Sequence, residues 1–391
     1  LFIGISAGVG IMVAQYFGAK SREDLSETIG NCITITALCS IFIALLSMII
    51  VRPMLEMLNT PESIMGWCES YLLISMVGGA GMAFYNILSG ILRGMGDSFS
   101  ALLYLLVATV INIVLDIAFV AGLGMEVPGV ALATVIAQAV SAWLCFKKLT
   151  KMGEVFELNK DRLKPKAKYV KQIVTLGVPS GVTQMIFSSA MIIVQSLTNS
   201  FGEMFIAANV IIMRVDGFAM MPNFSFGTAM TTYAGQNIGA GKIDRVTKGA
   251  KQGTLMAVGV SATITAIILI FGKYLMGIFT ETAELVDMSR YLMGILAVGY
   301  VAMAVTQSLS GVMRGAGDTV TPMWISMFTT VLVRVPVAYG ISFLTRTPEL
   351  PFGRFECIHI SLLASWCIGA ILTAIFYGRG KWKNKAIRIH K

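Results

Sequence analysis

The sequence is poor in charge, and this is its first constraint on function. Charged residues make up 13% of the 391 residues, hydrophobic residues make up 56%, and the mean hydropathy is +0.77. A water-soluble domain averages about 25% charged residues. The low charge therefore argues against an ordinary soluble domain, and the chain is long enough for several membrane-spanning helices of ~20 residues each.

Cysteine and histidine are also scarce. Six cysteines are scattered without a Cys-x-x-Cys pair, which argues against a zinc site or a disulfide framework. Of the two histidines, His390 lies in the tail and His359 near the end of an apolar segment, and no His-Glu-x-x-His motif occurs. These absences predict a protein that is not an enzyme and that has no catalytic or structural metal and no organic cofactor.

Long apolar segments alternate with short polar stretches. They are longer than the strictly alternating strands of about ten residues found in membrane β-barrels, so we expect them to be helices. The eleven segments are 1–17, 29–51, 66–92, 98–122, 128–147, 171–200, 204–236, 248–271, 286–313, 319–344 and 357–378.

Positive charge is distributed unevenly between the two ends of these helices. If the polar stretch after the first segment is cytoplasmic, 23 of the 30 lysines and arginines fall on the cytoplasmic side and five on the outer side. This bias is typical of membrane proteins, so we interpret the net charge of +9 as a determinant of orientation and not as a sign of nucleic-acid binding. We expect a multi-pass protein of the cell membrane, specifically a bacterial inner membrane, with a cytoplasmic C-terminus.

Two short motifs each occur twice at one separation. SGILRGMGDS at 89–98 matches SGVMRGAGDT at 310–319, and QYFGAK at 15–20 matches QNIGAG at 236–241, both at an offset of 221 residues. Because the two copies share one orientation, they indicate two halves related by a pseudo-twofold axis along the membrane normal, a layout known in secondary transporters.

The glycines of the longer motif suit a tight turn, and we expect its arginine and aspartate to lie in cytoplasmic water or among headgroups. A phosphate-binding loop would require a preceding strand and the pattern Gly-x-x-x-x-Gly-Lys-Ser/Thr, and both are lacking. The residues expected to form structural turns are Gly90, Arg93, Gly94, Gly96, Asp97, Gly311, Arg314, Gly315, Gly317 and Asp318.

A basic polar stretch separates the two halves and is either a solvated connector or a segment that lies on anionic lipid headgroups. The predicted organisation is an N-terminal lobe at 1–148, a cytoplasmic linker at 149–170, a C-terminal lobe at 171–378 and a basic cytoplasmic tail at 379–391. The repeat places the counterpart of segment 171–200 about fifty residues before Leu1. We therefore expect a protein of two six-helix lobes from which this sequence lacks the first helix.

Ionisable residues inside the predicted spans are functional candidates, because they usually face an interior cavity or pathway. Asp116 is the strongest of them. Asn112 lies one turn earlier on the same helical face, and at 1.5 Å per residue Asp116 and Thr134 both lie ~9 Å below the outer boundary. Their oxygen atoms suit Na⁺, and a buried carboxylate can also carry a proton. A structural cluster of hydrogen-bonded polar groups is the alternative.

The two repeated motifs, together with LGVPSG at 176–181 and NIVLD at 112–116, resemble the MATE family, the multidrug and toxic compound extrusion transporters. The resemblance implies an all-α integral membrane fold with eleven of twelve transmembrane helices present. It also implies export of small organic compounds, cationic or amphiphilic, by alternating access coupled to inward movement of H⁺ or Na⁺.

The resemblance favours one branch of the family. In the DinF-like branch, the residues that match Asn112, Asp116 and Thr134 contribute to the cation or proton site. The NorM-like branch has acidic residues on its seventh and tenth helices, where this chain has Phe187 and Met303.

Further polar residues are candidates for the lining of a substrate cavity. Arg214 and Asp216 are two residues apart and point to different faces of their helix, so they either flank a cavity or pair with neighbouring helices. Gln184, Asn209 and Gln307 are the other candidates. The expected partners are small organic substrates and membrane lipids, with no nucleic acid, and we expect a monomer. The alternative function is a flippase for lipid-linked precursors of the same superfamily.

Overall fold

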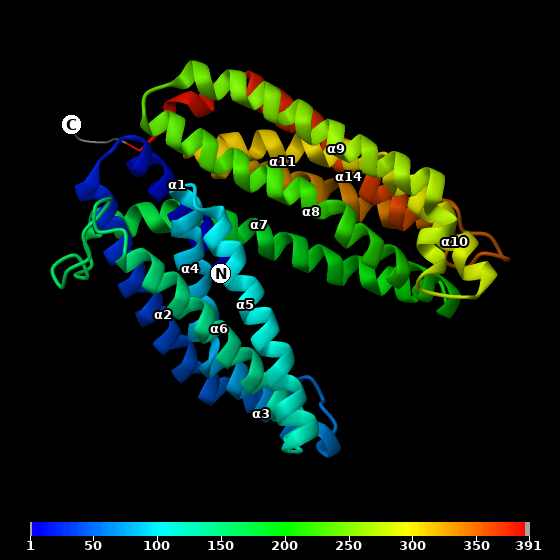
Figure 1. Cartoon of the computed structure of the whole chain (residues 1–391). Coiled ribbons are helices and arrows are strands. Elements are labelled where there is room, and N and C mark those ends of the chain that lie inside the picture. The colour runs from blue at the N-terminus through cyan, green and yellow to red at the C-terminus, as the bar shows by residue number, and fades with distance from the viewer. Residues whose placement is uncertain (1, 388–391) are drawn as a thin grey trace. The chain divides into compact units, whose positions relative to one another are not determined.

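The computed structural model describes residues 2–387, in which the regular elements are all helical and a single isolated bridge joins Thr347 and Leu350 (Figure 1). The α-helices are α1 (Phe2–Gly18), α2 (Arg22–Met57), α3 (Glu62–Val77), α4 (Gly79–Gly94), α5 (Ser98–Asp116), α6 (Glu126–Thr150), α7 (Ala167–Asn199), α8 (Glu203–Gly239), α9 (Ile243–Gly277), α10 (Ala283–Ala297), α11 (Gly299–Gly315), α12 (Val320–Met327), α13 (Val335–Leu344) and α14 (Cys357–Gly378). Two π-helical segments, η1 (Ile117–Gly122) and η2 (Phe328–Arg334), continue α5 and α12, and a short 3-10 helix, η3 (Lys381–Asn384), follows α14. Residues 388–391 of the predicted tail lie outside the described residues.

The helices confirm the prediction of an all-α membrane protein. Within residues 2–387, nine helical spans are long and apolar enough to cross a membrane, and α10 with α11 adds a tenth if the 42° bend between them belongs to one span. α1 is a shorter apolar helix. Each predicted segment corresponds to one helix or to consecutive helical pieces, although the segments at 66–92 and 286–313 are interrupted at Gly78 and Val298.

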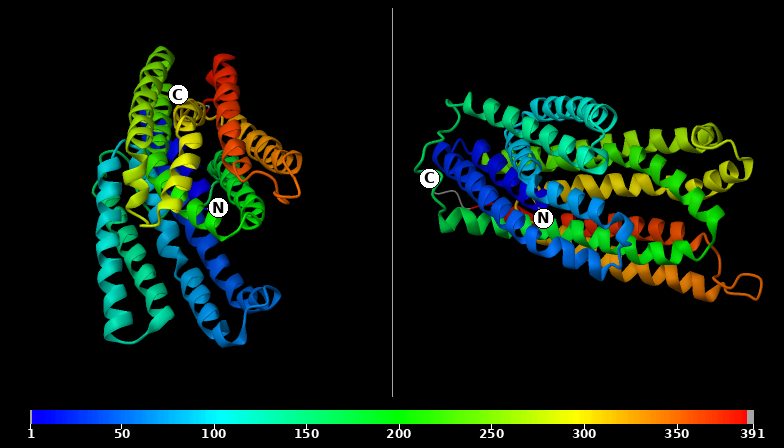
Figure 2. Two further views of the ribbon diagram at one scale, coloured as in Figure 1. Left: turned by 90° about the vertical axis from the view of Figure 1, so that its right-hand side faces the viewer. Right: turned by 90° about the horizontal axis from the view of Figure 1, so that it is seen from below.

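The described chain divides into two compact units, and the division falls inside α7, between Val178 and Pro179. In the first unit, α4 packs against α1, α2 and α6, and α6 also packs against α3 and α5. In the second unit, α11 packs against α8, α9 and α14, and these helices run alongside one another (Figures 1 and 2). The helices α4 and α11 carry the two copies of the longer repeated motif, so each copy lies on the most extensively packed helix of its unit.

Both copies of that motif form the same turn. Gly96 and Gly317 have φ angles of +93° and +96°, a backbone conformation that glycine adopts without a steric penalty. The next residue, Asp97 or Asp318, accepts a hydrogen bond from the backbone N–H three residues later, at 3.0 and 3.2 Å respectively. Each aspartate therefore caps the start of the following helix.

The turn is shorter than the sequence suggests, because six of the ten predicted turn residues are helical. Those six are Gly90, Arg93 and Gly94 in α4, and Gly311, Arg314 and Gly315 in α11. The two arginines are half-buried in the last turns of their helices and not freely solvated. At that position a positive charge interacts favourably with the unpaired C-terminal carbonyl groups.

The helical glycines allow close contact between neighbouring helices. A Cβ atom at Gly94 would lie 2.8 Å from the backbone oxygen of Gly10 in α1. In the second unit, a Cβ atom at Gly315 would lie 3.0 Å from the backbone nitrogen of Gly235 in α8. Small residues spaced four apart, such as Gly90 and Gly94, are a common means of bringing membrane helices together, so the motif stabilises packing as well as forming a turn.

Candidate ion-coupling site

Asp116 is the last residue of α5 and directly precedes the π-helical segment η1. Asn112 and Asp116 are half-buried, whereas Ile113, Val114 and Ile117 are 54%, 58% and 63% exposed. The polar side chains therefore share one face of the helix, and the exposed apolar side chains occupy another. A switch from α-helical to π-helical hydrogen bonding is frequent at functional sites.

Asn112 contacts Thr134 across the packed pair α5 and α6. The Nδ2 atom of Asn112 donates a hydrogen bond of 3.3 Å to Oγ1 of Thr134. The Thr134 hydroxyl in turn donates to the backbone oxygen of Val130 at 3.1 Å. Because a hydroxyl has one proton and two lone pairs, the bond to Val130 leaves the Thr134 oxygen free to accept.

Asp116 has an unused acceptor beside this pair. One carboxylate oxygen, Oδ1, is buried without a hydrogen-bond partner. Buried polar atoms without a partner are rare in folded proteins, and each calls for a specific explanation. A carboxylate, an amide and a hydroxyl on two neighbouring helices can together offer oxygen atoms to a small cation, or the carboxylate alone can take a proton.

The residues predicted to line a substrate cavity differ in their exposure and in their hydrogen bonds. Arg214 is exposed, whereas Asp216 is half-buried and accepts a hydrogen bond of 2.9 Å from the Tyr300 hydroxyl. Gln184 is exposed, Asn209 and Gln307 are half-buried, and within residues 2–387 no hydrogen bond joins these three to one another.

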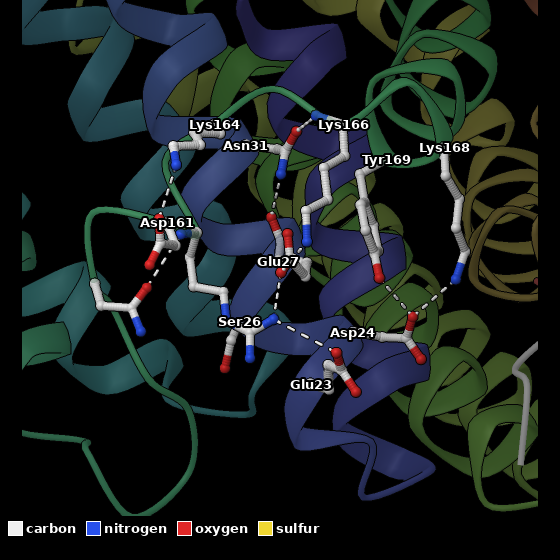
Figure 3. A network of polar contacts seen from close by, with 12 residues as sticks. Glu23, Asp24, Ser26, Glu27, Asn31, Asp161, Lys164, Lys166, Lys168 and Tyr169 are labelled. Atoms are coloured by element: carbon white, nitrogen blue, oxygen red, sulfur yellow. Dashed lines mark hydrogen bonds and ion pairs between the residues drawn. The ribbon is translucent and has the colours of Figure 1, made fainter.

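A polar network between α2 and the predicted linker was not anticipated (Figure 3). Glu27 of α2 is 1% exposed and accepts hydrogen bonds from Arg162 and, at 2.6 Å, from Nζ of Lys166. The hydrogen bond to Glu27 raises the pKa of Arg162. Asn31, one turn further along α2, accepts the backbone N–H of Lys166 at 2.6 Å. The linker is therefore bound along the first unit and is not a loose connector.

The start of α7 belongs to the same network. Asp24 of α2 accepts hydrogen bonds from the Tyr169 hydroxyl at 2.8 Å and from Nζ of Lys168 at 3.0 Å (Figure 3). One feature of the sequence is consistent with this arrangement. Acidic residues at the start of an otherwise apolar helix are opposite in charge to a basic segment elsewhere in the chain. The charges alone did not identify which helix end the linker would contact.

Two repeated helical units with an ionisable group inside a membrane span are a layout found in many membrane transporters. The family model described as MatE matches residues 1–118 and 179–340. The chain therefore belongs to the MatE family of membrane transporters, whose members are not enzymes.

Curated relatives cover almost the whole chain. It is 28% identical to "Probable multidrug resistance protein YoeA" of Bacillus subtilis (strain 168), over 98% of this chain and 83% of that protein. It is 25% identical to "Probable multidrug resistance protein NorM" of Thermotoga maritima, over 99% of this chain and 83% of that protein.

Solved structures show the same fold. A crystal structure of MATE in the bent conformation superposes with a TM-score of 0.89 at 21% identity, covering 98% of this chain and 84% of that one. An outward-facing multidrug resistance MATE family transporter of the MOP superfamily also gives a TM-score of 0.89, at 21% identity, over 98% of this chain and 85% of that one.

Proposed function

We propose that the protein is a cation-coupled antiporter that exports small organic compounds, cationic or amphiphilic, by alternating access. The relatives named as multidrug resistance proteins support the export of such compounds. The same names give no support to the flippase alternative. The proposal includes a monomer in a bacterial inner membrane, with the linker and the C-terminal tail in the cytoplasm.

The coupling ion, H⁺ or Na⁺, binds at Asp116, Asn112 and Thr134. The observation that carries this assignment is the unpartnered Oδ1 atom of Asp116 on the helical face from which Asn112 reaches Thr134. A charged carboxylate at membrane depth is costly, so binding a cation there stabilises the neutralised site. This assignment puts the ion-coupling site in the N-terminal lobe, as in the DinF-like branch.

Coupling requires that the bound ion and the bound substrate favour different states of the transporter. An ion that binds one state more tightly shifts the population toward that state, and only by its difference in affinity. The linkage is reciprocal, so a substrate that favours the other state promotes ion release.

The test is efflux of a fluorescent organic cation such as ethidium from liposomes that contain the protein. We expect efflux to accelerate when an inward gradient of H⁺ or Na⁺ is imposed, and the gradient that works identifies the ion. Efflux that is indifferent to both gradients would refute cation coupling. Efflux only of a lipid-linked oligosaccharide would refute the substrate class.

A further inference from the structure

A second half-buried carboxylate lies in the other unit. Asp216 of α8 accepts a 2.9 Å hydrogen bond from the hydroxyl of Tyr300 in α11, which is fully buried. The side chains around the pair are mainly apolar and include Val215 and Leu296. Asp216 therefore belongs to different helices and to a different unit from the Asp116 site.

One basic side chain with unused hydrogen-bonding capacity lies near this carboxylate, and a second lies near the first. Arg334, at the end of η2, interacts electrostatically with Asp216, and its Nε atom is buried without a hydrogen-bond partner. His359 of α14 is 2% exposed, interacts electrostatically with Arg334, and has a buried Nδ1 atom without a partner. Within the part of the chain that the structure describes, no direct ion pair joins Arg334 to Asp216.

This arrangement is a poor structural ion pair. A buried pair is stabilising only when the two charges are in good contact and their remaining hydrogen-bonding groups are satisfied. Here the contact is indirect and two nitrogen atoms remain unsatisfied. The cluster is therefore better explained by a group that changes its charge than by a fixed salt bridge.

The neighbouring charges favour a proton as the ligand over a metal cation. Arg334 would repel a metal cation, and among the described residues only the Tyr300 hydroxyl supplies a side-chain oxygen in contact with the carboxylate. Hard cations such as Ca²⁺ and Mg²⁺ take six or more oxygen ligands, which this cluster does not offer. A proton, in contrast, requires only one carboxylate oxygen as its binding site.

Tyr300 can accommodate both charge states of Asp216. Its hydroxyl donates to the ionised carboxylate, and it can instead accept from the carboxylic acid, because a phenol is both donor and acceptor. In the second case its own proton needs another acceptor. The Sδ atom of Met293 lies 3.6 Å from the Tyr300 oxygen and can serve as a weak one.

We propose that Asp216 is a second proton-binding group, with Tyr300 as its switchable hydrogen-bond partner and Arg334 as its counter-charge, and that its protonation regulates transport. The proton comes from the aqueous phase, binds a carboxylate oxygen, and returns to the aqueous phase when the group ionises again. No titratable side chain besides Tyr300 and Arg334 interacts with Asp216 among residues 2–387. Of the helices that pack on α8, α11 supplies Tyr300, α10 supplies the neutral Met293 beside Tyr300, and α9 supplies no titratable partner. The regulatory part rests on the proposed export function, whereas proton binding does not.

Infrared difference spectroscopy of the reconstituted protein tests proton binding without requiring transport. We expect a pH-dependent carboxylic acid band that persists in Asp116→Asn and is absent from Asp216→Asn. An asparagine at 216 keeps the size of the side chain and an oxygen that can accept from Tyr300, so the variant preserves the local packing. If the bands of Asp216→Asn titrate as in the wild type, the proposal is wrong.

Two further variants test the roles of the neighbours. Tyr300→Phe removes a hydrogen bond to the charged form, and Arg334→Gln removes a stabilising charge, so we expect the proton to bind about tenfold more tightly in each, a rise of about one pH unit in the midpoint of the band. Arg334→Lys should restore a midpoint close to that of the wild type. Tyr291→Phe and Arg290→Gln, which change exposed side chains of α10, are the matched controls. Unchanged midpoints in both test variants would overturn the assigned roles.

Transport measurements separate this proposal from the coupling assignment. We expect Asp216→Asn to lose at least part of the pH dependence of efflux while an inward cation gradient still accelerates efflux. A wild-type pH profile in Asp216→Asn would refute regulation by this group. If the Asp216 band titrates but no gradient drives efflux in the wild type, the proposed function fails and proton binding stands.

Discussion

Asn112 of α5 reaches across to α6 and donates a 3.3 Å hydrogen bond to the hydroxyl of Thr134. The bond joins two helices that are consecutive in the chain, and it lies one helical turn from the unpartnered Oδ1 atom of Asp116. This small cluster is the part of the molecule on which the coupling proposal depends.

Thr134→Val tests whether the hydroxyl contributes to ion binding. Valine has a similar shape but no oxygen, so Asn112 loses its acceptor and the site loses one oxygen atom. A hydrogen bond contributes about 0.5–1.5 kcal/mol, so we expect the cation concentration for half-maximal efflux to rise about three- to tenfold. Thr134→Ser keeps the hydroxyl and should stay close to the wild type. Equal behaviour of the valine and serine variants would argue against a role for the hydroxyl.

Glu27→Gln tests the attachment of the linker to α2. The substitution removes the negative charge that Arg162 and Lys166 share. Hydrogen bonds to charged groups contribute about 1.5–3 kcal/mol, so we expect the free energy of unfolding to fall by about 2 kcal/mol, measured by thermal or denaturant unfolding in detergent.

The control for Glu27→Gln is Asp161→Asn. Asp161 pairs with Lys164 at 2.8 Å, but the two side chains are 83% and 75% exposed. Exposed pairs contribute little to stability, so the control should unfold like the wild type. Similar losses in both variants would mean that burial of Glu27 does not matter.

Gly315→Ala tests the close approach of α11 and α8. In an exposed helix interior this change is stabilising by roughly 0.5–1 kcal/mol. At Gly315 the added methyl group would meet the backbone of α8, and overpacking typically costs about 1–3 kcal/mol. We therefore expect a lower melting temperature. Gly66→Ala on α3, where a Cβ atom meets nothing within 4 Å, should be neutral or stabilising, and the same sign for both variants would contradict the packing explanation.

Asp97→Asn tests the helix cap through its pH dependence. Burial raises the pKa of Asp97, but hydrogen bonds from Ser100 and the charge of Lys148 outweigh it, so the pKa lies below its usual value. A lowered pKa in the folded state contributes stability above the unfolded pKa of about 3.9, and that contribution is lost as the pH falls through the folded pKa. Asparagine caps a helix about as well as aspartate, so the substitution removes mainly the negative charge at the helix N-terminus. We therefore expect Asp97→Asn to be roughly 0.3–1 kcal/mol less stable at neutral pH, with the difference shrinking below about pH 4. A difference that is constant with pH would exclude the ionised carboxylate as its source.

Much of the fold could be predicted because the signals are local or repeated. The segment predicted at 357–378 is α14 at Cys357–Gly378, since a long apolar run between polar residues has few alternatives in a membrane. The offset of 221 residues between the two motifs also relates individual hydrogen bonds. The backbone N–H groups of Ser100 and Thr321 donate equivalent bonds to the aspartates of the two copies. The break at Gly78 was not predictable, because a glycine within an apolar run is also common in unbroken membrane helices.

The site was predictable only in part. Helical spacing placed Asn112 and Asp116 on one face, and the hairpin geometry brought Thr134 to the same depth. The bond between Tyr300 and Asp216 joins residues 84 positions apart, and that between Arg162 and Glu27 joins residues 135 apart. Such contacts depend on which helices pack together, which periodicity within a single segment does not specify.

Gradient-driven efflux in Asp116→Asn tests the coupling claim most directly. In liposomes we expect the wild type to export ethidium faster under an inward H⁺ or Na⁺ gradient, and Asp116→Asn to show the same slow efflux with and without that gradient. Asp287→Asn, which changes an exposed carboxylate of α10, should respond to the gradient like the wild type. A wild-type response to the gradient in Asp116→Asn would contradict the account.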